Sequence, residues 1–307
     1  VVVQGPPVLL MHVAKGATTL RELQLGTQGD GTDGRDLSIL AQHIFGLKVQ
    51  EMAWSRPDNN LWLRLGDGSL ACMTYHYEHG IVGARRQPLP EGWTCESICC
   101  SPDPDGADRL TAALMRVKPG VGVQRAHCVL APREDGMFLD IASFYAGAPV
   151  STVAGLNHFE GEAVGVLADG AFIDGLVVSG GGVTLPAPAS HIFVGQKMLR
   201  QFKSLPFDPN RDGLPVAKVS RPSHAYVVLG CVEAVVRAEP QDEPDERAIP
   251  EEIVIQRRPG DTVPVVRRKR AKVALGSGAD RDVRVIVESD KPFDLKVFAL
   301  RPVYETP

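Results

Sequence analysis

Four consecutive basic residues near the C-terminus are the strongest candidates for contact with a polyanion. Arg267–Arg270 reads Arg-Arg-Lys-Arg inside the largely apolar segment Val263–Ala274. Clustered Lys and Arg neutralise phosphates, but charges on an edge strand also prevent pairing with a foreign strand. The preceding segment Asp242–Glu252 combines acidic residues with prolines and is predicted to be an exposed loop. We expect the basic run to face a neighbouring subunit or another protein, with that acidic loop as one candidate partner.

Two histidines and two cysteines raise the question of a zinc site. His76, His79, Cys95 and Cys99 could approach one another from adjacent strands. Cys95 and Cys99 are expected on the same strand face, but they are too far apart to share an ion without a bend. No CxxC spacing is present, and free cysteines are usually core residues. We therefore predict reduced, buried thiols and no metal for the six cysteines: Cys72, Cys95, Cys99, Cys100, Cys128 and Cys231.

One loop gathers residue types that perform acid–base chemistry. It contains Asn157, His158, Glu160 and Glu162, but no nucleophile or distant partner can be paired with them, and a turn that sets the entry of a strand is the expected role. Gly180–Gly182 lacks the GK[ST] sequence and the strand-to-helix context of a phosphate loop. No HExxH, GxSxG or GxGxxG signature is present. The sequence predicts no catalytic residues, no cofactor and no enzymatic activity.

Aromatic side chains gather in the first third of the chain. They could form a stacking platform for sugars, or they could alternate inward and fill the core of a sheet. The core interpretation is favoured for Trp54 and Trp62. The complete group is Trp54, Trp62, Tyr75, Tyr77 and Trp93.

The segment that contains these aromatics has the pattern of a four-stranded antiparallel sheet. Asp67-Gly68 separates two of its apolar runs, which is a strong hairpin signal, and Asp169-Gly170 repeats that signal later. Four strands in about 40 residues match one propeller blade. An ordinary meander explains this segment equally well, but a similar span at Trp93–Leu130 favours repeated units. The apolar runs are Glu51–Trp54, Leu61–Leu65, Leu70–Tyr77 and Ile81–Ala84.

One short helix is predicted at residues 37–45. Asp36 is the expected N-cap and Gly46 the expected residue beyond the C-terminus. His43 falls near the helix end, where a solvated position is expected. The predicted apolar face consists of Leu37, Leu40, Ala41 and Ile44.

Length and composition indicate a β-rich chain of several domains. The 307 residues are 44% hydrophobic, with 31 Gly and 24 Pro, which favours sheets with many turns. A formal net charge of −4 argues against a general DNA or membrane binder. No apolar run reaches the roughly 20 residues of a membrane span. The predicted fold is all-β: a propeller-like domain at 1–138, a small β-barrel-like unit at 139–205 and a C-terminal β domain at 206–307.

Several segments, in this order and spacing, resemble the tail nozzle proteins of short-tailed bacteriophages, also called tail tubular protein B. The resemblance extends from about Leu9 to Val303, and it rests on packing and turn patterns. The chain has no initiator Met and no complete first unit, so it is expected to be the C-terminal portion of a longer protein. The segments are Asp36–Phe45, Val49–Trp54, Leu61–Arg86, Glu96–Cys100, Val150–Gly170 and Val283–Val303.

The resemblance implies a structural virion protein that is made in the host cytoplasm. It implies a ring of six copies below the portal and adaptor, with tail fibres attached nearby and a central channel for genome delivery. DNA is expected to pass this channel without specific binding. The sequence departs from the family pattern at Arg267–Arg270 and at the acidic segment, so the channel-facing residues stay unassigned. The alternative is a propeller that binds or cleaves carbohydrate, although no pair of carboxylates for hydrolysis can be assembled from the sequence.

Overall fold

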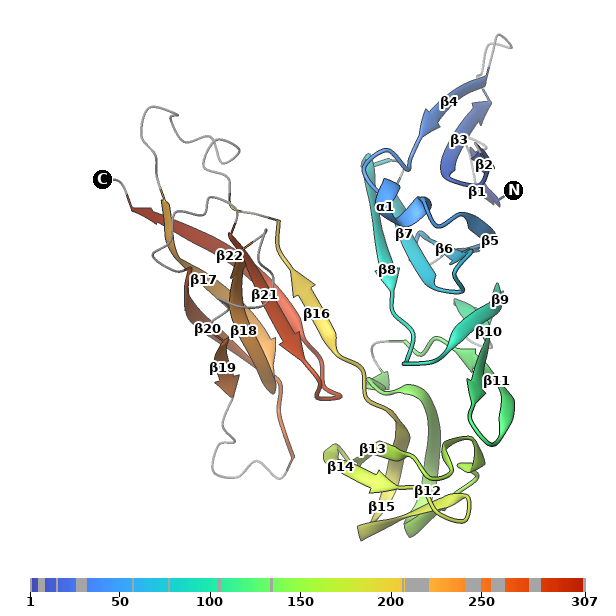
Figure 1. Cartoon of the computed structure of the whole chain (residues 1–307), viewed down its shortest axis with the longest axis vertical. Coiled ribbons are helices and arrows are strands. Elements are labelled where there is room, and N and C mark those ends of the chain that lie inside the picture. Colours follow the sequence, from blue (N-terminus) through green and yellow to red (C-terminus); the bar gives the residue numbers. More distant parts are fainter. Residues whose placement is uncertain are drawn as a thin grey trace. The chain divides into compact units, whose positions relative to one another are not determined.

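A computed structural model gives the fold of this chain (Figure 1). It divides into an N-terminal unit, Val1–Pro132, and a C-terminal unit, Arg133–Pro307. We predicted the first boundary at residue 138, and the two later predicted domains fall within one unit that has two cores. The structure describes residues 2–4, 9–14, 16–25, 32–56, 58–76, 78–103, 106–132, 135–205, 207, 221–240, 250–254, 263–275 and 283–305.

The N-terminal unit consists of three antiparallel meanders, in each of which the strands that are adjacent in sequence pair with one another. The first contains β1 (Val2–Gln4), β2 (Leu9–Ala14), β3 (Thr19–Leu25) and β4 (Thr32–Asp36). The second contains β5 (Val49–Ser55), β6 (Asn60–Leu65), β7 (Leu70–His76) and β8 (Ile81–Gln87). The third contains β9 (Thr94–Pro102), β10 (Asp108–Lys118) and β11 (Gly122–Val129). The prediction of propeller-like antiparallel sheets is confirmed.

Two carboxylates, one buried and one half-buried, connect each meander to the next. The Tyr75 hydroxyl of β7 donates to Glu22 Oε2 of β3 over 2.5 Å. Glu51 of β5 accepts hydrogen bonds from the N–H of Ile98 (2.8 Å) and the hydroxyl of Ser97 (3.0 Å), both on β9. Because a buried polar group must be hydrogen-bonded, the contact of Glu22 fixes which strands lie against each other, and the hydrogen bonds of half-buried Glu51 add to it.

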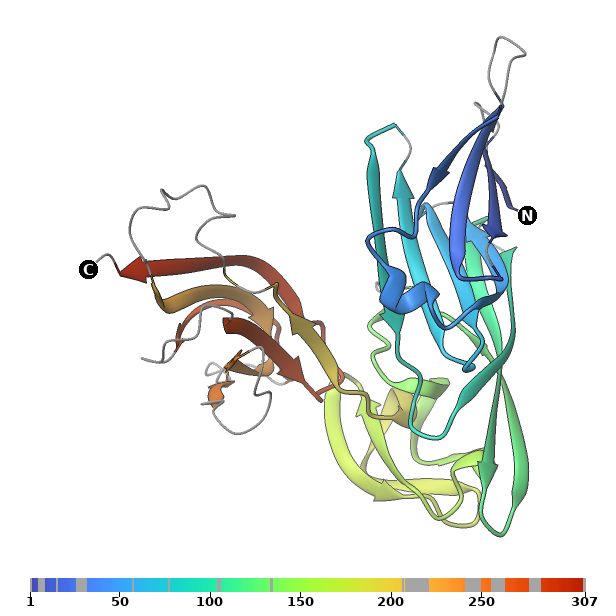
Figure 2. The ribbon, with the colours of Figure 1, turned by 45° about the horizontal axis from the view of Figure 1, so that its top comes forward.

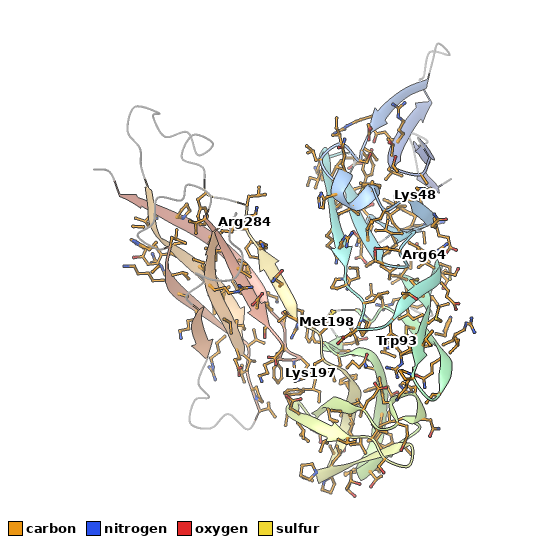
Figure 3. The ribbon with its side chains drawn as sticks, viewed as in Figure 1. Lys48, Arg64, Trp93, Lys197, Met198 and Arg284 are labelled. Carbon is orange, nitrogen blue, oxygen red and sulfur yellow. The ribbon has the colours of Figure 1, made fainter. Side chains whose placement is uncertain are left out.

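Glu51 is also paired with a cation of its own sheet. Arg64 of β6, labelled in Figure 3, places Nη2 3.3 Å from Glu51 Oε1. Burial raises the pKa of Glu51, but the hydrogen bonds from Ile98 and Ser97 and the charge of Arg64 outweigh it. The net result is a pKa below the ordinary value of 4.5. The carboxylate form therefore stabilises the folded state.

The helix is shorter than predicted. Helix α1 spans only Gln42–Phe45, and its N-cap is Ala41, which makes no side-chain cap. Asp36 instead ends β4 and accepts hydrogen bonds from the N–H and the hydroxyl of Ser38 at 2.9 and 2.6 Å. This local Asx turn satisfies the backbone in a non-helical way and delays the start of the helix.

The C-terminus of the helix also differs from the prediction. Gly46 has φ −56° and stays in the right-handed region, whereas Lys48 takes the positive φ of 65°. Leu40, predicted on the apolar face, is 91% exposed because it lies in the turn before the helix. Leu37, Ala41 and Ile44 are buried as predicted. His43 is exposed in the last turn, which confirms the solvated interpretation.

The C-terminal unit begins with a small antiparallel sheet in the order β12-β15-β13-β14. A short 3-10 turn, Asn157–Phe159, leads into β13. The core of this sheet contains buried residues from β12, β13 and β15, among them Val153, Val166 and Ile192. The strands are β12 (Asp140–Ala154), β13 (Ala163–Ala168), β14 (Ala171–Val177) and β15 (Gly182–Gln196).

The rest of the unit is a β-sandwich of two sheets (Figures 1 and 2). One sheet has the order β16-β21-β18-β19 and the other β20-β17-β22. Alternate residues such as Val227 of β17 and Val285 of β21 point into the shared core and are fully buried. The strands are β16 (Arg200–Lys203), β17 (Arg221–Cys231), β18 (Glu233–Pro240), β19 (Pro250–Val254), β20 (Arg267–Ala274), β21 (Val283–Ser289) and β22 (Lys296–Glu305).

Both Asp-Gly hairpins form with a left-handed glycine, as predicted. Gly68 has φ 79° between β6 and β7, and Gly170 has φ 81° between β13 and β14. Asp169 also has a positive φ, 47°, which gives that turn the type I′ geometry. The two sites differ in their surroundings. A Cβ at Gly68 would lie 2.8 Å from Thr94 Cβ, whereas a Cβ at Gly170 would meet its nearest neighbour at 3.6 Å.

Alanine at the two glycines should therefore have different costs. Gly170→Ala should destabilise the protein by about 1 kcal/mol through backbone strain alone. Gly68→Ala should cost about 2 kcal/mol, because strain and the contact with the β-branched Thr94 add. Urea denaturation of both variants measures the difference. Equal costs would show that the contact with Thr94 relaxes freely.

Replacing Glu51 should remove a pH-dependent part of the stability. Glu51→Gln loses the charge that binds Arg64 and should lower the unfolding free energy by about 1 kcal/mol at neutral pH. The pKa of Glu51 is depressed in the folded state, so its contribution is present above the unfolded value and is lost as the pH falls through the folded value. The difference between the two proteins should shrink at about pH 3. Glu91→Gln, at an exposed loop carboxyl, is the control. A pH-independent difference would contradict this role.

Candidate functional site

The outer face of the sheet β20-β17-β22 carries the basic run and is the candidate site. Ala225, Val227 and Leu229 of the central strand β17 point into the core. Since side chains alternate along a strand, the residues between them face outward. On β20, Ala271 and Val273 are buried, which turns the even-numbered residues of that strand outward in the same way.

Backbone register brings basic residues from two strands to this one face. Gly230 lies between Arg268 and Lys296, and Tyr226 lies between Lys272 and Arg301. Val228 lies between Arg270 and Ala299. We call this surface the basic face; its cations, all exposed, are Arg268, Arg270, Lys272, Lys296 and Arg301.

Two of the arginines lie on aromatic rings. The guanidinium of Arg270 is 3.9 Å from the ring centre of Tyr226, and that of Arg268 is 4.9 Å from the ring centre of Phe298. Phe298 is 51% exposed. Its ring packs over Gly230, in the space that a side chain on that residue would take. Cation–π contact limits the rotamers of a long side chain, so both guanidinium groups are held in place before any ligand arrives.

The two outer faces of the sandwich differ in how their charges are compensated. On the opposite sheet, Arg237 lies 3.1 Å from Glu288, which also accepts a hydrogen bond from Gln201. Burial raises the pKa of Glu288, but the hydrogen bonds of Arg237 and Gln201 lower it below its ordinary value overall. Arg284, labelled in Figure 3, belongs to β21 of that same sheet.

On the basic face, one ion pair is formed within the described part of the chain. Lys296 lies 2.9 Å from Asp294. No carboxylate among the described residues pairs with Arg268, Arg270, Lys272 or Arg301. The described side chains of this face therefore present a surplus of positive charge to solvent, which attracts an anionic ligand.

The sequence identified only part of this face. Arg268 and Arg270 belong to the predicted run, and β20 is indeed an edge strand. Lys269 is exposed, but it occupies an odd-numbered position of β20 and so does not belong to the basic face. Arg267, also odd-numbered, is half-buried. The expected acidic partner lies outside the described residues at 241–249, and the side chains of 250–252 are not described either, so that pairing stays a prediction. Lys296 and Arg301 are five residues apart and reach the same face only because the register shifts opposite Val228 and Leu229, so alternation along β22 could not have located them.

The four residues considered for zinc do not converge. Cys95 and Cys99, predicted on one face of a strand, lie on opposite faces because β9 shifts its register against β10 between Leu114 and Ala113. A bulge of one residue reverses which side chains point inward. Within the described residues, no three His, Cys, Asp or Glu side chains gather to hold a metal ion.

The cysteines are free thiols in the structure. Cys72, Cys95 and Cys231 are buried as predicted, Cys100 and Cys128 are half-buried, and Cys99 is exposed, which corrects the prediction for that residue. Burial raises the pKa of the Cys100 thiol to about 12. A thiol in that state is a poor nucleophile.

The loop with acid–base residue types is a structural turn, as expected. Glu160 accepts hydrogen bonds from the backbone N–H groups of Gly180 (3.0 Å) and Gly181 (2.7 Å). Two successive N–H groups of this kind form an anion-binding nest. Here the anion is a carboxylate of the protein itself, so the glycine run is occupied. Glu162 accepts from the side-chain amide of Gln196 instead.

The other two residues of this loop also lie at the turn. Asn157 begins the 3-10 turn, and its Oδ1 lies beside Gly181, where a Cβ would collide with it. His158 contacts the ring of buried Phe159, with ring centres 4.1 Å apart.

The aromatic cluster fills the sheets of the N-terminal unit. Trp62, Tyr75 and Trp93 are 3%, 1% and 5% exposed, and Trp54 is half-buried against the same core as Tyr75. Arg116 stacks on Trp93 (labelled in Figure 3) at 4.7 Å. Tyr77 lies outside the described residues. The core interpretation is confirmed for Trp62, and an open platform for sugars is not formed by these rings.

Comparison with known proteins adds little to this description. No family model matches the chain, and no curated protein matches it. Two solved structures of an exo-β-1,3-galactanase from Phanerochaete chrysosporium are similar, one with galactose and one a variant with β-1,3-galactotriose. Identities are 10% and 11%, TM-scores 0.28 and 0.26, and the alignments cover 94% and 96% of this chain. The chain spans 63% and 65% of the galactanase chains.

Within the described residues, no helix is both long enough and apolar enough to cross a bilayer.

Removing the built-in anion should loosen the glycine turn. Glu160→Ala leaves the N–H groups of Gly180 and Gly181 without their acceptor and should destabilise the C-terminal unit by about 1 kcal/mol. Glu160→Gln keeps one acceptor oxygen and should cost less. Hydrogen exchange at Gly180 and Gly181 reports the local opening directly. Unchanged protection in Glu160→Ala would show that the carboxylate does not hold the turn.

Proposed function

We propose that this chain is a non-enzymatic structural protein of a short-tailed bacteriophage tail, working in a ring-shaped nozzle through which the genome leaves. The ring-shaped assembly is what the resemblance of the sequence to tail nozzle proteins implies. The succession of separate β units, each with its own core, supports it because such units present several faces to different neighbours. The proposed location is the virion, and the proposed partners are further copies of the chain, the tail adaptor and the fibres.

One surface carries the assembly part of this proposal. The β10–β11 hairpin ends in three exposed valines: Val117 (70%), Val121 (63%) and Val123 (56%). Val117 and Val123 are direct partners across the hairpin, so their side chains form one apolar tip on the same face. Apolar side chains gathered at an exposed tip are typical of protein–protein contacts.

The proposed binding partner of the tip is a second copy of this chain. A contact between a hairpin tip and a different surface of the next copy is heterologous, and heterologous contacts generate a ring when the rotation from copy to copy closes. A carbohydrate ligand would require polar groups around an apolar ring face. Further from the tip, the same outward face carries exposed Arg125 and His127, opposite Met115 and Ala113, so the polar groups of this face lie below the valines and do not surround them.

Charged substitutions at the tip should prevent assembly. Val117→Asp combined with Val123→Asp should reduce ring formation at least ten-fold in mass photometry, because two carboxylates would be desolvated at the contact. Unfolding temperatures should change little, since both side chains are exposed in the isolated chain. Val177→Asp, at an equally exposed valine of β14, is the matched control.

Two results would contradict the proposed function. One is an intact ring in the doubly substituted protein. The other is turnover of bacterial polysaccharide by the purified chain that is lost on replacing a carboxylate, which would favour the glycan-cleaving alternative.

A further inference from the structure

We propose that the basic face binds single-stranded nucleic acid through its phosphates. The inference goes beyond the proposed function, because a passive conduit needs no fixed phosphate contacts. It rests on five exposed cations that share one sheet face, on two aromatic rings among them, and on the single ion pair among the described residues of that face.

The geometry of a sheet spaces these cations regularly. Arg268, Arg270 and Lys272 occupy alternate positions of β20, so their Cα atoms follow each other at about 6.7 Å. Lys296 and Arg301 stand on β22, two strand spacings or about 10 Å across the sheet. Two lines of positive charge thus flank the central strand β17. A flexible chain with one negative charge per repeat can satisfy such lines along its length.

The arginines are held in a form suited to phosphate. A guanidinium held over an aromatic ring can still present N–H groups to two oxygens of one phosphate. Arg270 lies over the ring of Tyr226 and Arg268 over that of Phe298. Because part of the side-chain entropy is already lost in the free protein, the cost of ordering on binding is reduced.

The aromatic rings favour nucleic acid over an acidic protein surface. Phe298 is half exposed beside Arg268, and an unpaired base can stack on an exposed ring or on the guanidinium plane above it. Acidic side chains of a protein have no flat π-face for this position. Duplex DNA keeps its bases inside, so it can use the cations but not Phe298.

The test is fluorescence anisotropy of the full chain with a labelled dT15 oligonucleotide, a duplex of equal length and poly-glutamate. If three to five phosphates are contacted, the affinity for dT15 should fall about 20- to 100-fold between 50 and 200 mM salt. The triple variant Arg268→Gln, Arg270→Gln and Lys272→Gln should flatten the slope of log K against log salt by about 2. Phe298→Ala should weaken dT15 binding about five-fold or more without changing the slope.

A charge-matched control separates this face from the general charge of the protein. Arg56→Gln, Arg86→Gln and Lys203→Gln remove three exposed cations that lie outside the basic face and should leave binding unchanged. Equal weakening by both triple variants would overturn the proposal, as would the absence of salt-dependent binding to dT15 at 50 mM salt. Poly-glutamate binding as tight as dT15, with the same loss in the first variant, would assign the face to an acidic protein partner instead. Ring assembly is measured separately, so failure here leaves the proposed function standing.

Discussion

The described sheets bury apolar side chains on at least one face, and the need to cover these side chains determines the rest of the structure. In the N-terminal unit, neighbouring meanders and helix α1 provide the cover, and Leu20, Phe45 and Leu63 meet in one core. In the sandwich, the two sheets cover each other. Apolar contact is not directional, so it cannot by itself fix which meander lies where. Glu22 and Glu51 add that information, because hydrogen bonds are directional and each carboxylate accepts from donors on one particular neighbouring strand.

Patterns that depend on neighbouring residues were visible in the sequence. The Asp-Gly turns at Gly68 and Gly170 follow from the steric freedom of glycine, and the apolar runs around them follow from burial of one face. The helix was overestimated because Asp36 is a suitable N-cap residue that here bonds to Ser38 in a turn. Both geometries use the same carboxylate, and the choice between them depends on how β4 leaves its sheet.

Features that depend on register were not visible. The register shift that separates Cys95 from Cys99 is set by pairing with β10, which no local signal in β9 reveals. The basic face combines Tyr226, Arg270 and Arg301, which are far apart in the sequence and meet only when β17 lies between the other two strands. For Gly180–Gly182 the sequence correctly indicated that no phosphate loop is present. It did not show that the carboxylate of Glu160 takes the place of an anionic ligand there.

Among the described residues, Arg237 pairs with Glu288 on one outer face of the sandwich, while no carboxylate pairs with the cations next to Tyr226 on the other. This surplus of positive charge on one face adds a dipole component across the sandwich. A dipole in the field of a polyanion experiences a torque, so the sandwich would turn toward such a polymer before touching it. At 0.1 M salt this orienting field extends only about 10 Å, which confines the effect to the last stage of approach. Ionic strength would therefore change the association rate, through the orientation of the first collisions. This effect is separate from its effect on the strength of the final contacts.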